Sequence, residues 1–157
     1  MRPYPEEVLR ALQAGVGAHF APELSSNYAR AQFAFSMLLF SVVQRGYDSA
    51  VPDLVEANAA LREMLAETRA ALASIPRDDA RRGVAALAAL PVPAATLHLS
   101  ALRNENEALR GGVSAIAALV EAAVDDSELG PLRTVRATMY AWFAADARKR
   151  IVPILSG

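Results

Sequence analysis

The sequence contains no cysteine among its 157 residues. Disulfides, thiolate metal sites and a cysteine nucleophile are therefore excluded, and the absence fits a reducing compartment. Histidine is nearly as scarce, since His19 and His98 are the sole examples. Neither belongs to a Glu-x-x-His pair of the kind that helical bundles use for di-metal sites. We therefore predict no metal site and no cofactor.

The chain also lacks an excess of either charge. The chain has sixteen basic and seventeen acidic residues, which give a formal net charge of −1. This balance argues against a nucleic-acid-binding surface. The longest strongly apolar stretch covers residues 33–43, too short for the roughly 20 residues that cross a bilayer. Residues 1–7 lack the basic-then-apolar order of a signal peptide. We expect no membrane partner, a cytoplasmic location and, from the abundance of Ala, Leu and Arg, a bacterial source.

Catalytic motifs are missing as well. The sequence has no Ser-x-x-Lys, no Gly-x-Ser-x-Gly and no phosphate-binding glycine loop. Most paired carboxylates fall at expected helix starts, where the helix dipole accounts for them, or in a loop. Glu105 is the exception, because we expect it to face inward, where it could act as a base. We therefore name no catalytic residue and favour a protein that is not an enzyme.

What the chain does have is apolar residues at helical spacing. It is 54% hydrophobic and 21% charged, typical of a chain that folds around a core, and its length fits one domain over residues 1–157. No strand pattern and no Asn-Gly or Asp-Gly hairpin signal occurs. We predict an all-α, up-and-down bundle of four long helices plus one or two shorter ones. The expected helices cover residues 5–19, 25 or 26 to 45, 50–73, 76–90, 94–124 and 131–151.

Three of these helices carry more specific predictions. The helix at 25–45 has the widest apolar arc, so we expect it to be the central and most buried element. Gly111 and Gly112 interrupt the helix at 94–124 and predict a kink, a break or a close helix contact. In the last helix Tyr140, Trp142 and Phe143 point in more than one direction, and some of them could pack against a second copy.

One polar residue recurs inside four of the apolar stripes. In each stripe it lies four residues after one apolar or aromatic residue and three before another, so all three share a helix face. A polar group buried there without a partner costs roughly 1–3 kcal/mol. The four recurring residues are Gln32, Asn58, Asn106 and Arg136.

Two interpretations of these residues stay open. In the structural one, Asn58 and Asn106 lie at similar depth and hydrogen-bond to each other, while Gln32 and Arg136 lie nearer the opposite end and Arg136 pairs with Glu105 or Glu63. In the functional one, polar groups line a cleft that orients a ligand. The candidate ligand-binding residues are then Gln32, Asn58, Glu105, Asn106 and Arg136.

Two segments carry a resemblance to a known family. The segment YARAQFAFSML at residues 28–38, with Leu132-Arg-Thr-Val135 near the end, resembles an uncharacterised bacterial family of small helical domains. Its members are encoded near aminoglycoside-phosphotransferase-like and acyl-CoA dehydrogenase-like proteins. The resemblance implies an all-helical fold and an accessory role beside a larger enzyme. It implies no catalytic residue.

These observations lead to two functional hypotheses. The first is a non-enzymatic accessory or interaction protein that forms a homodimer, with a larger enzyme as a further possible partner. The alternative is a small-molecule-binding or enzymatic bundle with a polar cleft around Arg136 and Asn106. Partner, ligand and pathway are not encoded in any motif of the chain.

Overall fold

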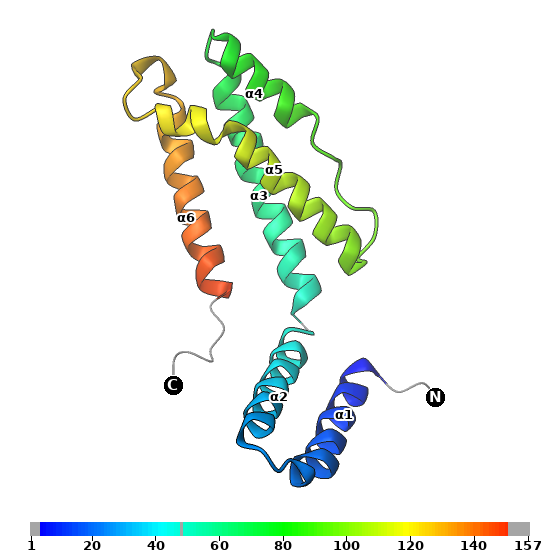
Figure 1. The fold of residues 1–157 in the computed structure, drawn as a ribbon. Coiled ribbons are helices and arrows are strands. Elements are labelled where there is room, and N and C mark those ends of the chain that lie inside the picture. Colours follow the sequence, from blue (N-terminus) through cyan, green and yellow to red (C-terminus); the bar gives the residue numbers. More distant parts are fainter. Residues whose placement is uncertain (1–3, 48, 151–157) are drawn as a thin grey trace. The chain divides into compact units, whose positions relative to one another are not determined.

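A computed structural model describes residues 4–47 and 49–150, which fold into α-helices and two short 3₁₀ helices without any strand in these ranges (Figure 1). The all-α prediction is therefore confirmed. In chain order the elements are α1 (Pro5–Phe20), η1 (Ala21–Glu23), α2 (Asn27–Tyr47), α3 (Ala50–Ala73), α4 (Asp78–Ala88), α5 (Leu99–Ala122), η2 (Ser127–Leu129) and α6 (Leu132–Arg150).

The contacts within the chain divide it into two compact units, residues 1–50 and residues 51–157. The first holds α1 and α2, and the second holds α3 to α6. Our expectation of one domain built as a single up-and-down bundle of four long helices stays a prediction.

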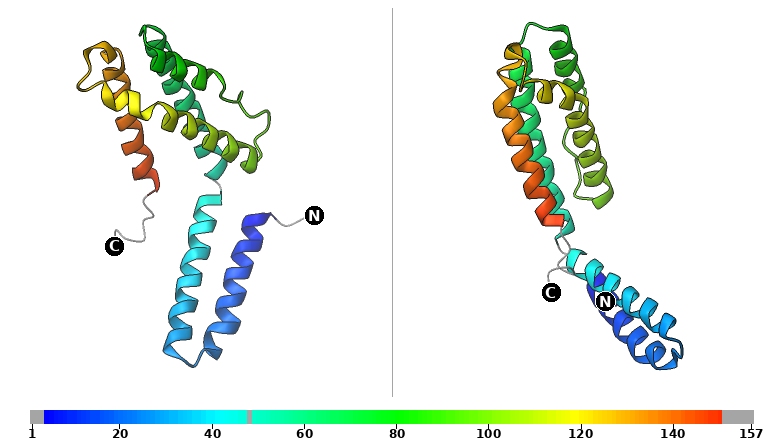
Figure 2. Two further views of the ribbon diagram at one scale, coloured as in Figure 1. Left: turned by 45° about the horizontal axis from the view of Figure 1, so that its top comes forward. Right: turned by 60° about the vertical axis from the view of Figure 1, so that its left-hand side comes forward.

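The first unit is a helical hairpin. Helices α1 and α2 lie side by side and are joined through η1 (Figure 2). The hydroxyl of Ser26 accepts a hydrogen bond from the Ala29 amide at 3.1 Å, so Ser26 caps α2 as its residue type favours. Between the helices, Nε2 of Gln13 donates to Oγ of Ser41 at 3.1 Å.

The prediction that residues 25–45 form the most buried helix is wrong. No described residue of α1 or α2 is buried. The apolar arc of α2 is as wide as the sequence indicated, but within this unit α1 alone lies against it. A hairpin of two helices has one contact line, so a wide arc leaves large side chains outside it.

The hydrophobic core lies in the second unit. Helices α3, α5 and α6 each supply a stripe of buried side chains, and α4 covers one side of them. The stripe predicted for α3 is buried from Leu61 to Leu72. The largest fully buried side chains of the core are Leu61, Leu72, Leu109, Ile116, Leu129, Leu132 and Val120.

The helix boundaries differ from prediction at the connection between α4 and α5. Residues 94–98, which were predicted to begin this helix, instead continue the loop that starts at Pro91. Pro91 and Pro93 end α4, and the Ala94 amide donates to Oε2 of Glu105 at 2.9 Å, which folds the loop back onto α5. The short helix η2 was not predicted. The predicted end of the last helix near Ile151 lies outside the described residues.

Helix α5 is continuous through Gly111 and Gly112. The two glycines differ in their surroundings. A Cβ on Gly112 would lie 3.0 Å from Cδ1 of Leu90, whereas a Cβ on Gly111 would meet no atom within 4 Å. Of the alternatives that the sequence left open, the close contact is therefore the one observed, and Gly112 provides it.

Candidate functional site

Two buried asparagines join α3 to α5. Asn58 is 3% exposed and Asn106 is 7% exposed. Nδ2 of Asn106 donates to Oδ1 of Asn58 at 2.7 Å, and Nδ2 of Asn58 donates to the carbonyl oxygen of Leu102 at 3.0 Å. The predicted hydrogen bond between the two side chains is confirmed, and it satisfies Oδ1 of Asn58 and Nδ2 of Asn106 inside the core.

The chain of polar contacts continues to α6 through a residue that the sequence reasoning missed. Nε of Arg110 donates to Oδ1 of Asn106 at 2.9 Å, and its NH2 group binds Oδ2 of Asp146 at 2.7 Å. The guanidinium also stacks on the Trp142 ring, 5.1 Å from its centroid. Arg110 lies four residues after Asn106, so helical spacing alone could have linked the two.

Glu105 fastens the loop before α5. Its Oε1 accepts from Nε of Arg62 at 2.8 Å, and its Oε2 accepts from the Ala94 amide at 2.9 Å. NH2 of Arg62 also donates to the carbonyl oxygen of Pro91 at 2.9 Å. Both carboxylate oxygens are therefore engaged in holding residues 91–94, which is a structural task. Glu105 is buried, as expected.

Arg136 does not pair with Glu105 or Glu63, so that part of the prediction is wrong. Its Nε binds Oε2 of Glu121 at 3.1 Å, and 35% of its side chain is exposed. The hydroxyl of Tyr140 donates to Oε1 of Glu121 at 2.8 Å, and the Arg136 guanidinium lies over the Tyr140 ring. The hydrogen bond from Tyr140 is the main cause that lowers the pKa of the Glu121 carboxyl, and the hydrogen bond from Arg136 is the second.

Gln32 is the second residue whose surroundings were predicted wrongly. Its stripe on α2 is exposed, so the prediction of a core-facing side chain is wrong at this position. Gln32 belongs to the first unit, whereas Asn58, Glu105, Asn106 and Arg136 belong to the second. Within the second unit the structure brings Asn58 and Asn106 into direct contact, with Glu105 beside Asn106 in sequence, while Arg136 makes its own cluster.

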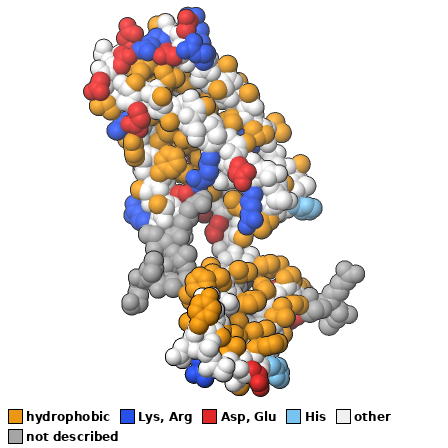
Figure 3. Space-filling model, viewed as in Figure 1, with side chains coloured by type: hydrophobic (Ala, Val, Ile, Leu, Met, Phe, Trp, Pro, Cys, Tyr) orange, Lys and Arg blue, Asp and Glu red, His pale blue; other side chains and the backbone are white. Residues whose placement is uncertain are grey.

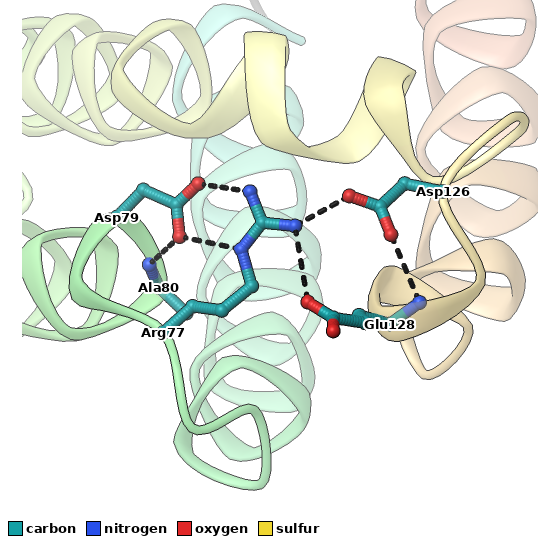
Figure 4. A network of polar contacts seen from close by, with 5 residues as sticks. All are labelled: Arg77, Asp79, Ala80, Asp126 and Glu128. Carbon is teal, nitrogen blue, oxygen red and sulfur yellow. Dashed lines mark hydrogen bonds and ion pairs between the residues drawn. The ribbon is translucent and has the colours of Figure 1, made fainter.

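The largest ionic cluster joins the start of α4 to η2 (Figure 4). Arg77 forms two hydrogen bonds with Asp79, at 3.1 and 2.6 Å, and a third with Asp126. Glu128 lies 3.8 Å from the same guanidinium. Hydrogen bonding to Arg77 is the main cause that lowers the pKa of Asp79 and of Asp126, and it raises the pKa of Arg77 in return. The cluster fastens two loops at one end of the second unit.

Two surface hollows are large enough to receive a ligand or a partner side chain. One lies between α3 and α6, has a volume of about 330 Å³ and is lined by Trp142, Asp146 and Lys149 among others. The second is a groove along α1 with a volume of about 610 Å³, lined by Val8, Ala11, Leu12, Gly15, Val16 and Phe20, with Glu7 and His19 at its ends. Neither lining includes Asn106 or Arg136.

The most unusual surface lies on the hairpin. Figure 3 shows hydrophobic side chains gathered over the visible face of α1 and α2. Tyr28 is 76% exposed and Phe35 is 56% exposed, and Phe20, Leu39 and Val43 are also largely open. Single exposed apolar residues need no explanation, but several large ones gathered on one hairpin are unusual for a protein surface.

The described residues contain no cluster of three or more His, Asp or Glu side chains that could hold a metal ion. Among the described helices, none combines the length and apolar character needed to cross a membrane. Every buried side-chain nitrogen or oxygen in this part of the chain has a hydrogen-bond partner. The interior of the second unit thus leaves no polar group waiting for a ligand in the described residues.

Fold and contacts together define an all-α protein with a satisfied core in one unit and an open apolar hairpin in the other. No protein-family model, no curated protein and no solved structure matches this chain.

Proposed function

We propose that this chain is a non-enzymatic interaction protein that associates with a second copy of itself through the α1–α2 hairpin. The observation that carries the proposal is the hairpin's lack of any buried described residue beside its many exposed large apolar ones. Two helices with one shared contact line are marginal in water. A second hairpin would cover both helices and complete a four-helix, up-and-down bundle.

The composition of the hairpin favours an identical partner. The segment Asn27–Tyr47 contains Arg30 and Arg45 as its charged residues and no acid. The exposed stripe of Tyr28, Phe35, Leu39 and Val43 carries no charge at all. A second copy can therefore cover the stripe without burying a charge of the stripe itself, which would cost several kcal/mol.

The exposed area is of the size that a stable dimer needs. At about 200 Å² for each aromatic side chain, the open parts of Phe20, Tyr28 and Phe35 come to roughly 400 Å² per copy. Val8, Leu12, Leu39 and Val43 add their own exposed fractions. Together they approach the roughly 800 Å² that each partner buries in a standard interface.

Light scattering coupled to size exclusion tests the proposal on the whole chain. At micromolar concentration we expect about twice the monomer mass of 16.7 kDa. Leu39→Glu places a charge on the stripe and should give a monomer. Val92→Glu is the matched control, because Val92 is 82% exposed in the loop between α4 and α5. A monomeric wild type, or equal behaviour of the two variants, would contradict the proposal.

Two further expectations accompany this function. The family resemblance at residues 28–38 and 132–135 supports an accessory role beside a larger enzyme. The composition supports a cytoplasmic protein of bacterial origin.

A second candidate function is small-molecule binding in the hollow between α3 and α6. The observation that favours it is that Trp142 and the Asp53 carboxylate line the same hollow of about 330 Å³, in which the other two acids, Glu56 and Asp146, are paired with Lys149 and Arg110. Such a lining suits an amine. A diamine that raises the Tm of the wild type, with a smaller effect on Asp53→Asn, would support amine binding. No change in Tm at millimolar diamine would contradict it.

A further inference from the structure

The groove along α1 is lined by two small residues, Ala11 and Gly15, and by the larger Val8, Leu12 and Phe20. A Cβ on Gly15 would meet no atom within 4 Å, so nothing of the same chain fills the space above it. Two small residues one turn apart let another helix approach closely.

The exposed stripe of α2 consists of large side chains. Tyr28, Phe35, Leu39 and Val43 follow one another at spacings of seven, four and four, so their side chains stand in one row along the helix. At 1.5 Å per residue this row is about 22 Å long and the α1 groove about 20 Å long. Row and groove thus match in length, yet both remain open on the same hairpin.

We propose that the α2 row of one copy docks into the α1 groove of a second copy, and the reverse. The inference rests on the proposed self-association and names the two surfaces that meet. Such an exchange is symmetric, so it closes after two copies and leaves neither surface open. Row-against-row packing would cover α2 but leave the groove above Gly15 empty.

Gln32 fits this arrangement. It is the one polar residue in the row and lies one turn from its beginning. The groove is apolar in its middle, with Glu7 at one end and His19 at the other. Because the row and the groove have similar lengths, either direction of docking places Gln32 about one helical turn, roughly 6 Å, inside an end of the partner's groove. A shift of register by one turn would carry the amide further into the apolar middle, so Gln32 disfavours such shifts.

Cross-linking tests the inference directly, because the chain has no cysteine of its own. Gly15→Cys protein is mixed with Phe35→Cys, Leu39→Cys or Val43→Cys protein carrying a tag of different mass, then oxidised and run on a non-reducing gel. We expect a mixed disulfide with at least one row variant. Gly17→Cys is the matched control, since two residues along a helix point nearly opposite ways and Gly17 does not line the groove.

The result that would overturn the inference is a dimer in light scattering that gives only row-to-row disulfides, or that cross-links Gly17→Cys as well as Gly15→Cys. The proposed self-association would survive either result. A monomer would instead contradict both proposals. It would indicate that another part of the same chain covers the hairpin.

Filling the groove gives a second measurement. Gly15→Leu should weaken dimerisation by about tenfold or more, the size of effect seen when a central interface contact is lost, whereas Gly17→Leu should leave the dissociation constant unchanged. Circular dichroism of both variants checks that the helix content is retained. Unchanged dimerisation of Gly15→Leu would contradict docking into the groove.

Discussion

At the scale of single residues, the Asn58–Asn106 pair is the most informative contact. Nδ2 of Asn106 and Oδ1 of Asn58 satisfy each other where water cannot reach. Removing Asn106 leaves Oδ1 of Asn58 buried without a donor, whereas removing both leaves no side-chain amide at this position. The pair should therefore behave non-additively.

We predict that Asn106→Leu alone lowers the free energy of unfolding by about 1–3 kcal/mol. The double variant with Asn58→Leu should be tolerated or even stabilised, because no amide is then left unpaired. Urea denaturation of wild type, both single variants and the double variant gives the coupling energy. Additive effects of the two substitutions would show that the pair carries no interaction of its own.

A second residue-scale prediction concerns pH. The folded state lowers the pKa of Asp79 and Asp126 through Arg77, so it favours their charged forms. The resulting stability is present above the ordinary aspartate pKa near 4 and is lost as the pH falls through the lowered values.

Arg77→Met should therefore destabilise the protein at neutral pH, where it leaves Asp79 and Asp126 facing each other without a cation. The difference between wild type and variant should shrink as the pH falls below about 4, the ordinary aspartate pKa. Unfolding by urea at pH 7, 5, 4 and 3 measures it. A difference that stays constant across this range would rule out the ion pairs as its source.

At the scale of helices, the same spacing pattern had two outcomes. The stripes around Gln32 and Asn58 have similar spacing in the sequence, but the face of Asn58 is covered by α5 and that of Gln32 is not. Periodicity shows which side chains share a helix face. It does not show whether another element covers that face, since this depends on tertiary contacts far apart in sequence.

The same reasoning separates the correct helix predictions from the wrong ones. Most helix positions followed from local spacing and from caps such as Ser26, and the Asn58–Asn106 contact followed from equal depth on two helices. The extension of the loop through residues 94–98 could not be predicted, because Glu105 of the following helix holds the loop. The partner of Arg136 was missed for a similar reason, since several acids on α3 and α5 were equally placed by sequence.

Two adjacent glycines of α5 offer a matched test of packing. Gly111→Ala should raise the free energy of unfolding by about 0.5–1 kcal/mol, because alanine favours the helix and Gly111 has free space around it. Gly112→Ala gains the same helix preference but brings its Cβ to 3.0 Å from Cδ1 and 3.1 Å from Cδ2 of Leu90. We expect no net gain there. Chemical denaturation compares the two, and equal stabilisation by both would contradict a tight contact at Gly112.

At the scale of the whole molecule, stability divides between the units. Residues 51–157 contain the buried core, while no described residue of α1 or α2 is buried. Self-association would therefore couple the stability of the hairpin to protein concentration. Any partner that binds the folded form raises its apparent stability by mass action.

We predict that the Tm of the wild type rises as the protein concentration is raised from about 1 to about 100 µM, because association with a second copy stabilises the folded form by mass action. The Tm of Leu39→Glu should stay constant over the same range, because the charge prevents association. Circular dichroism at matched heating rates measures both. A wild-type Tm that is independent of concentration would count against the dimer.

The open hairpin has a consequence for the order in which the molecule matures. Chains fold from the N-terminal side as they are synthesised, so α1 and α2 leave the ribosome ahead of the α3–α6 core. That core can form as soon as its own helices are complete. If the hairpin associates as proposed, its last folding step is an encounter with another chain, which makes that step bimolecular and slowest when the protein is scarce.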